Sequence, residues 1–152
     1  MQSTTTTFRI RPISSASADE LRAAGGEIYV ADTVPGYPCR QCLRDAAIGE
    51  ELILVSHDPF STDTPYRSAS PIFLHRLDCS AELDQSAVPR QLAVRQLSVR
   101  AFDKAELMTD ADVIDGGSLA ETLDRFFADD SVRSVHVHNA SRGCWAATVK
   151  PD

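Results

Sequence analysis

The sequence predicts an α+β domain with a mostly antiparallel β-sheet, about two helices packed on it and a C-terminal β-hairpin. Segments with a strand-like pattern outnumber those with a helical pattern. The helical segments do not alternate with the strands, which excludes a repeating βαβ arrangement. The 152 residues show no repeat or break in composition, so a single domain over residues 1–152 is expected, with the threonine run 4–7 as a frayed start.

Five segments are predicted to form strands before the C-terminal hairpin. Residues 8–11 alternate apolar and basic side chains, the period-two pattern of a half-buried strand. Residues 27–33 are rich in strand-forming side chains, and residues 51–57 and 72–77 are apolar runs bounded by Pro, Ser and Asp. Residues 92–102 are long and irregularly patterned, which indicates a strand with a bulge or twist.

Two helices are expected from their capping signals. The first has Ser17 as N-cap, with Glu20 three residues later, and ends at Gly25. The second begins after Ser118, with Glu121 completing a capping box. Apolar side chains then recur with helical spacing, which predicts a face that packs on the core. This face consists of Leu119, Leu123, Phe126 and Phe127.

The chain ends with two strand-like segments, residues 132–139 and 144–149, joined by a Ser-Arg-Gly turn. An even-length turn places His138 opposite Trp145, where the two rings would stack as a cross-strand pair. His136 and His138 then share one strand face, roughly 6.5 to 7 Å apart by the strand rise. Such a pair could bind a metal or transfer a proton, but packing in the sheet is the favoured interpretation.

Composition narrows the possible partners. The net charge of −7 argues against nucleic-acid binding, which depends on clustered Lys and Arg. The longest strongly apolar stretch, residues 52–55, is too short to span a membrane, and the N-terminus lacks the pattern of a secretory signal. A cytoplasmic protein with free thiols is therefore expected, of undefined oligomeric state. Because nearly all the positive charge is arginine, a small anionic ligand is favoured.

Cys39 and Cys42 form a C-x-x-C motif, which occurs in redox pairs and as half of a zinc site. A redox pair requires a substantial helix behind the first cysteine, and Gly49 limits any helix here to about two turns. His75 and Cys79 would complete a four-ligand structural zinc site. Because free cysteines usually behave as small buried hydrophobes, the favoured prediction is scattered, inert cysteines with no cofactor, and zinc is the alternative.

Three segments in the right order, residues 37–60, 65–73 and 135–146, resemble a bacterial family catalogued as domain of unknown function 1203. The resemblance extends over residues 8–149. It implies a stand-alone bacterial protein. It brings no activity, cofactor or catalytic residue to this chain.

The motifs of that resemblance direct attention to Cys39, Arg40, Tyr66, Asn139 and Cys144 as members of one pocket. The main functional prediction is a binding or interaction module with Arg40 and Asn139 as polar anchors. One alternative is a thiol-dependent enzyme with Cys39 as nucleophile, its pKa lowered by Arg40 or a helix N-terminus. The other is the structural zinc protein.

Overall fold

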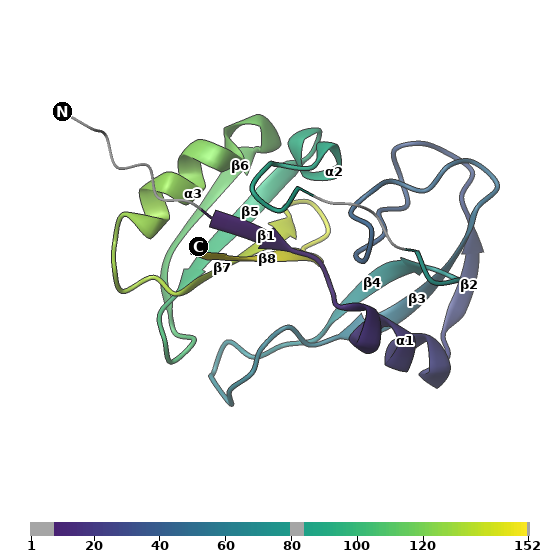
Figure 1. Ribbon diagram of the computed structural model, residues 1–152, viewed down its shortest axis with the longest axis horizontal. Helices are drawn as coiled ribbons and strands as arrows, with labels where there is room; N and C mark the ends of the chain where they lie inside the picture. Colours follow the sequence, from purple (N-terminus) through teal and green to yellow (C-terminus); the bar gives the residue numbers. More distant parts are fainter. Residues whose placement is uncertain (1–7, 80–83, 152) are drawn as a thin grey trace.

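The computed structural model of the protein describes residues 8–79 and 84–151, so the predicted frayed segment 4–7 lies outside the described residues. Within the described part, the chain forms two antiparallel sheets and three α-helices, which confirms the α+β class (Figure 1). The predicted sheet is therefore divided into two. No helix in this part of the chain has the length and apolar character needed to cross a membrane.

The larger sheet has five strands in the order β1-β8-β7-β5-β6, and the helix α3 covers one of its faces (Figure 1). The apolar stripe predicted for this helix is buried against Val135 and Val137 of the central strand β7. The opposite face of β7 packs against aromatic rings, including Phe60 from the loop that follows β3. The elements of this half are β1 (Phe8–Arg11), α2 (Arg90–Ala93), β5 (Gln96–Phe102), β6 (Met108–Asp115), α3 (Leu119–Phe127), β7 (Ser134–Asn139) and β8 (Trp145–Pro151).

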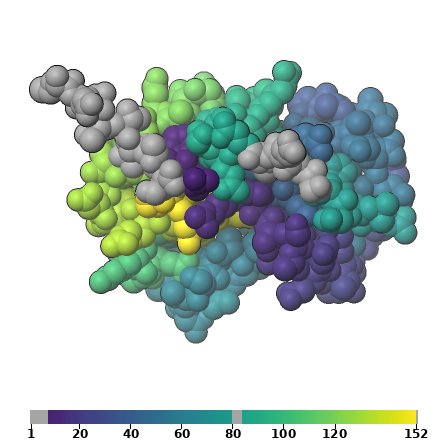
Figure 2. Space-filling model, viewed as in Figure 1, coloured from purple at the N-terminus to yellow at the C-terminus, as the bar shows by residue number. Residues whose placement is uncertain are grey.

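The smaller sheet has three strands in the order β2-β3-β4 and packs against the helix α1. Its core contains Ile53 from β3, Leu74 from β4 and Ala18 from α1, together with Trp145 from β8 of the larger sheet. This tryptophan joins the two halves, which form one continuous body in Figure 2. The elements of this half are α1 (Ser15–Ala24), β2 (Glu27–Val30), β3 (Glu51–His57) and β4 (Ser70–His75).

One predicted strand begins as a helix, and one strand of the structure was not predicted. Residues 92–102 begin in the short helix α2 and continue as β5, with the expected bulge at Ala101 and Phe102. Strand β6 was not predicted, because it lies at the edge of its sheet and carries mostly exposed, polar side chains. Edge strands of this kind lack the apolar alternation that identifies a half-buried strand.

The predicted helix caps also require correction. The N-cap of α1 is Ser14, whose hydroxyl accepts from the backbone N–H of Ser17, the residue predicted as the cap. The C-cap at Gly25 is confirmed, with a φ of 86° that favours glycine. Ser118 precedes α3 as predicted, but its side chain makes no capping hydrogen bond.

The C-terminal hairpin is confirmed, with His138 opposite Trp145 and a register shift between Val137 and His138. The predicted stacking of these two rings is wrong. The ring of Trp145 packs on His57, with 4.9 Å between ring centroids, because this tryptophan belongs to the core of the smaller sheet.

Candidate metal centre

Four side chains with metal-ligating atoms meet where the turn that follows Pro38 contacts the end of β4. The ligand atoms of Cys39, Cys42, His75 and Cys79 all lie within 4.8 Å of one another. Among residues 8–79 and 84–151, these four form the one group of at least three potential metal ligands. The prediction of scattered cysteines is therefore wrong for this Cys3His cluster.

The turn between Cys39 and Arg44 brings the two cysteines of the C-x-x-C motif to one side. Two backbone hydrogen bonds close this turn. The Leu43 N–H donates to the Cys39 carbonyl, and the Cys39 N–H donates to the Arg44 carbonyl. Leu43 has a φ of 54°, which is uncommon for a residue other than glycine and persists where the surroundings enforce it. Because the Leu43 side chain is buried in the core of the larger sheet, its packing supports this conformation.

Strand β4 brings the imidazole to the turn. Cys39 forms a parallel β-bridge with Phe73, and the Arg40 N–H donates to the Phe73 carbonyl over 3.0 Å. Side chains two residues apart share a strand face, so His75 lies on the same face as Phe73. The His75 backbone N–H also donates to the Cys39 sulfur at 3.4 Å. The spacing of these residues in the sequence does not reveal that the turn packs against a distant strand.

The distances within the cluster fit a tetrahedral zinc site. The sulfurs of Cys39 and Cys79 are 3.5 Å apart, and the Cys42 sulfur is 3.6 Å from Nδ1 of His75. Zn–S bonds of about 2.3 Å in a tetrahedron place neighbouring sulfurs about 3.8 Å apart. All four cysteines of the chain are free thiols, so the sulfurs are available as ligands.

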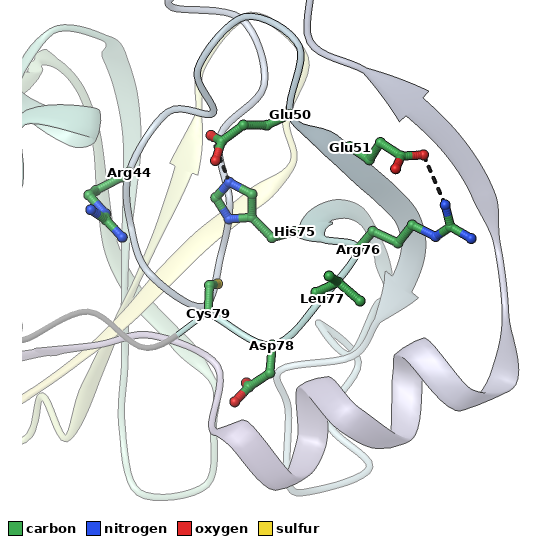
Figure 3. Close-up of a pocket in the computed structure, with 8 residues that line it drawn as sticks. All are labelled: Arg44, Glu50, Glu51, His75, Arg76, Leu77, Asp78 and Cys79. Atoms are coloured by element: carbon green, nitrogen blue, oxygen red, sulfur yellow. Dashed lines mark hydrogen bonds and ion pairs between the residues drawn. The ribbon is translucent and has the colours of Figure 1, made fainter.

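A carboxylate orients the imidazole of His75. Nε2 lies 3.2 Å from Oε1 of Glu50, and Figure 3 shows the ring directed at this carboxylate. Metal-bound histidines almost always donate their second ring N–H to a carboxylate, carbonyl or water. A proton on Nε2 leaves the lone pair of Nδ1 free, and Nδ1 is the atom beside the Cys42 sulfur. Glu50, which was not predicted, therefore selects the tautomer that a metal ligand requires.

Gln41, inside the C-x-x-C motif, links the cluster to α1. Its Oε1 accepts from Nη2 of Arg22 at 2.6 Å and from the Cys79 thiol at 3.7 Å, and its Nε2 donates to Asp78 at 2.8 Å. Nε of Arg22 donates to the His75 carbonyl over 2.8 Å. These outer contacts were not predicted, because they join residues far apart in sequence and no local pattern identifies them.

The protonation of the metal-free cluster shows how closely its members interact. Hydrogen bonds from the thiols of Cys42 and Cys79 hold the pKa of Cys39 well below its usual value. Hydrogen bonding to Cys39, and then to Cys42, raises the pKa of His75 to about 10. The same Cys39 sulfur raises the pKa of Cys79. In the absence of a metal, these shifts favour a thiolate at Cys39 and a protonated ring at His75.

A thiolate beside an imidazolium is also the arrangement of a cysteine nucleophile. The predicted nucleophile Cys39 is, however, fully buried, with 0% of its surface exposed. His75 and Cys79, which are partly exposed, line an open pocket of about 460 Å³ (Figure 3). This pocket offers an entry path for an ion, whereas the Cys39 sulfur faces the other members of the cluster.

The five residues predicted to share one pocket separate into three groups. Arg40, Asn139 and Cys144 line a common cavity. Cys39 belongs to the Cys3His cluster. Tyr66 lines neither the cavity nor the cluster, and its partly exposed ring packs on Phe102 at 6.0 Å between centroids.

The predicted pair of imidazoles on β7 lies outside the Cys3His cluster and has a different environment. The rings of His136 and His138 are 6.3 Å apart, and both side chains are buried. His136 packs between the rings of Phe60 and Phe102, each 4.7 Å away. Burial lowers the pKa of both histidines to about 4. This pair is neutral at physiological pH and packs within the sheet.

The fold and the cluster define a small α+β protein with a four-donor Cys/His centre. The chain belongs to the family described as "Protein of unknown function (DUF1203)", whose model matches residues 36–150. This match confirms the resemblance found in the sequence. It includes all four cluster residues and Glu50, whereas Arg22 lies before it. No curated protein and no solved structure shows a significant match to the chain.

Proposed function

We propose that the chain is a zinc-binding protein in which the Cys3His cluster holds one structural Zn²⁺. The observation that carries the proposal is the convergence of four donor atoms within 4.8 Å of one another. Three thiolates and one neutral imidazole suit Zn²⁺, and four protein ligands leave no open coordination position for a substrate. The carboxylate of Glu50 behind His75 supports the same assignment.

The metal would hold the segment between β2 and β3 in place. This segment has little regular structure, and an isolated bridge between Cys39 and Phe73 ties it to β4. A second bridge, between Pro38 and Asp45, lies within the segment itself. The segment nevertheless contributes Leu43 to the core of the larger sheet. A tetrahedral ion would fasten the segment to the end of β4, and the free energy of binding the metal would contribute to folding.

The structural zinc and the predicted binding module are compatible. Arg40, the predicted polar anchor, stands between the two cysteines of the C-x-x-C motif, so an ion bound there would also fix the backbone that carries this arginine. In this account the metal shapes the protein, and any ligand binds elsewhere.

The proposal is tested by elemental analysis of protein purified without an affinity tag that binds metals. We expect about one zinc per chain in the wild type, as for other structural zinc sites. Cys79→Ser should retain less than about a tenth of it after dialysis, because a thiolate ligand is lost. Cys144→Ser is the matched control, since it removes a thiol outside the cluster, and should keep its zinc. Stoichiometric iron, no stoichiometric metal, or unchanged zinc in Cys79→Ser would contradict the proposal.

A further inference from the structure

A second cavity, of about 720 Å³, lies beside the metal cluster but is lined by different side chains. Its volume is in the range of small-molecule sites. One wall is aromatic and the other carries positive charge and an amide. The side chains that define it are Tyr29, Tyr37 and Phe73 on the first wall, and Arg40, Asn139 and Arg142 on the second.

Arg40 is a buried cation without a carboxylate partner. Its side chain is 2% exposed, and it donates to two neutral acceptors, the carbonyls of Trp145 at 2.7 Å and Pro38 at 2.9 Å. It forms no ion pair with any residue in 8–79 or 84–151. Buried charges are normally paired, because removing an ion from water is costly. A guanidinium stays protonated in proteins, so this buried group carries a full positive charge.

The acidic groups near Arg40 do not complete a pair with it. Asp45 binds Arg95 through both carboxylate oxygens, at 2.6 and 3.0 Å, so its negative charge is paired with Arg95. The sulfur of Cys39 lies within the Cys3His cluster, beside the other ligand atoms. Cys144 lines the cavity itself but brings no carboxylate to the arginine. No Asp or Glu among the described residues lines the cavity.

Two further polar groups at this wall are available to a ligand. Arg142, on the exposed turn between β7 and β8, forms no ion pair with the described residues. Oδ1 of Asn139 is buried without a hydrogen-bond partner in the described part of the chain. A buried polar atom without a partner costs free energy, and a ligand that brings a donor would recover it.

The aromatic wall offers a flat apolar surface. Phe73 stands at its centre, with Tyr29 and Tyr37 each 5.4 Å away between ring centroids. Tyr29 is partly exposed, with 39% of its surface accessible. Aromatic rings pack favourably against other rings in edge-to-face or offset arrangements.

We propose that this cavity binds a small aromatic anion, with its carboxylate or phosphate between Arg40 and Arg142 and its ring against Phe73 and Tyr29. The proposal goes beyond the structural zinc, because the ligand touches neither the metal nor its four ligands. Arginine binds carboxylate and phosphate through the same planar, charge-assisted hydrogen bonds, so both groups are tested.

Calorimetric titration of the zinc-loaded protein with four probes tests the ligand class. We expect benzoate or phenyl phosphate to bind with a submillimolar Kd. Benzamide, which has the ring without the charge, and inorganic phosphate, which has the charge without the ring, should each bind at least about tenfold more weakly. Equal binding of inorganic phosphate and phenyl phosphate, equal binding of benzamide and benzoate, or no binding of either aromatic anion at 10 mM would overturn the proposal.

A pair of arginine variants locates the site. Arg142→Gln changes an exposed residue and should weaken binding of the preferred aromatic anion by about tenfold, the value of one charge-assisted hydrogen bond. Arg133→Gln changes another exposed arginine, which does not line the cavity, and should leave the Kd unchanged. Equal affinity in Arg142→Gln and wild type would contradict the site. Zinc is measured in every sample, so failure to bind the anion is distinguished from failure to bind the metal.

Discussion

The single imidazole of the Cys3His cluster and the pair of imidazoles on strand β7 have different kinds of surroundings. In the Cys3His cluster, the ring of His75 has a sulfur beside one nitrogen and a carboxylate beside the other. In strand β7, His136 is surrounded by aromatic rings, and its Nδ1 has no partner among the described residues. The comparison shows that the contacts of both ring nitrogens identify a histidine suited to bind a metal. Proximity to another histidine does not identify one.

The pKa values of the two regions move in opposite directions. Hydrogen bonding to Cys39 and Cys42 raises the pKa of His75 to about 10, whereas burial lowers the pKa of His136 and His138 to about 4. Nδ1 of His138 is 2.9 Å from the carbonyl of Gly143, so it carries the proton of a neutral ring. One region thus stabilises charge and the other excludes it.

Removal of the metal should produce the largest change in thermal stability, and this change should depend on the Cys3His cluster and not on Cys144. We expect a chelator to lower the Tm by more than about 15 °C, because structural zinc sites contribute a large share of the free energy of folding. Thermal unfolding followed by circular dichroism measures the change, and added zinc should reverse it. Cys144→Ser should show the same decrease as the wild type. A Tm within about 2 °C of the untreated value would contradict a structural metal.

The histidine pair on β7 should make the free energy of unfolding decrease in acid. Both rings are neutral in the folded protein, with pKa values of about 4, and titrate near 6.5 in the unfolded chain. The unfolded chain therefore binds more protons between these values. The stability that this pair contributes is present above pH 6.5 and is lost as the pH falls towards 4, by at most about 1.4 kcal/mol per pH unit for each ring.

The variant His136→Gln isolates that contribution. Its free energy of unfolding, measured by urea denaturation across this pH range, should change with pH by about one proton less than that of the wild type. Zinc loss in acid affects both proteins and cancels in the comparison. Identical slopes for the two proteins would show that His136 is not held neutral.

The smallest effect is expected from changing Glu50, the carboxylate that contacts the ring of His75. Glu50→Gln should weaken zinc binding by about tenfold, because outer-shell carboxylates of metal-bound histidines typically contribute this much. Glu51→Gln is the matched control, since this neighbouring carboxylate pairs with Arg76 at 2.9 Å on the exposed surface. Competition with a chromogenic chelator measures both affinities. Equal affinities would mean that Glu50 does not orient His75.

The sequence predicts those parts of the fold that local patterns determine. The strands at Phe8–Arg11 and Glu51–His57 have the predicted bounds, because their apolar side chains face a core. Strand β6 has no fully buried side chain, since only the partly buried Ile114 packs against the core, and it was missed. The cap of α1 was placed three residues late, because several serines in this segment could fill the same role.

The candidate site was harder to predict than the fold. The four ligands were named as one alternative, but spacing does not show that the turn at Cys39 docks beside β4. Glu50 and Gln41 had no recognisable signal, since their roles arise from hydrogen bonds between distant segments. The frequency with which free cysteines are simply buried therefore outweighed the alternative that grouped these four side chains.

X-ray absorption spectroscopy at the zinc edge of the purified protein tests the ligand set most directly. The account predicts a first shell of three sulfurs at about 2.3 Å and one nitrogen at about 2.0 Å. A shell of nitrogen and oxygen atoms alone, or one with a single sulfur, would place the ion outside the Cys3His cluster and contradict the account.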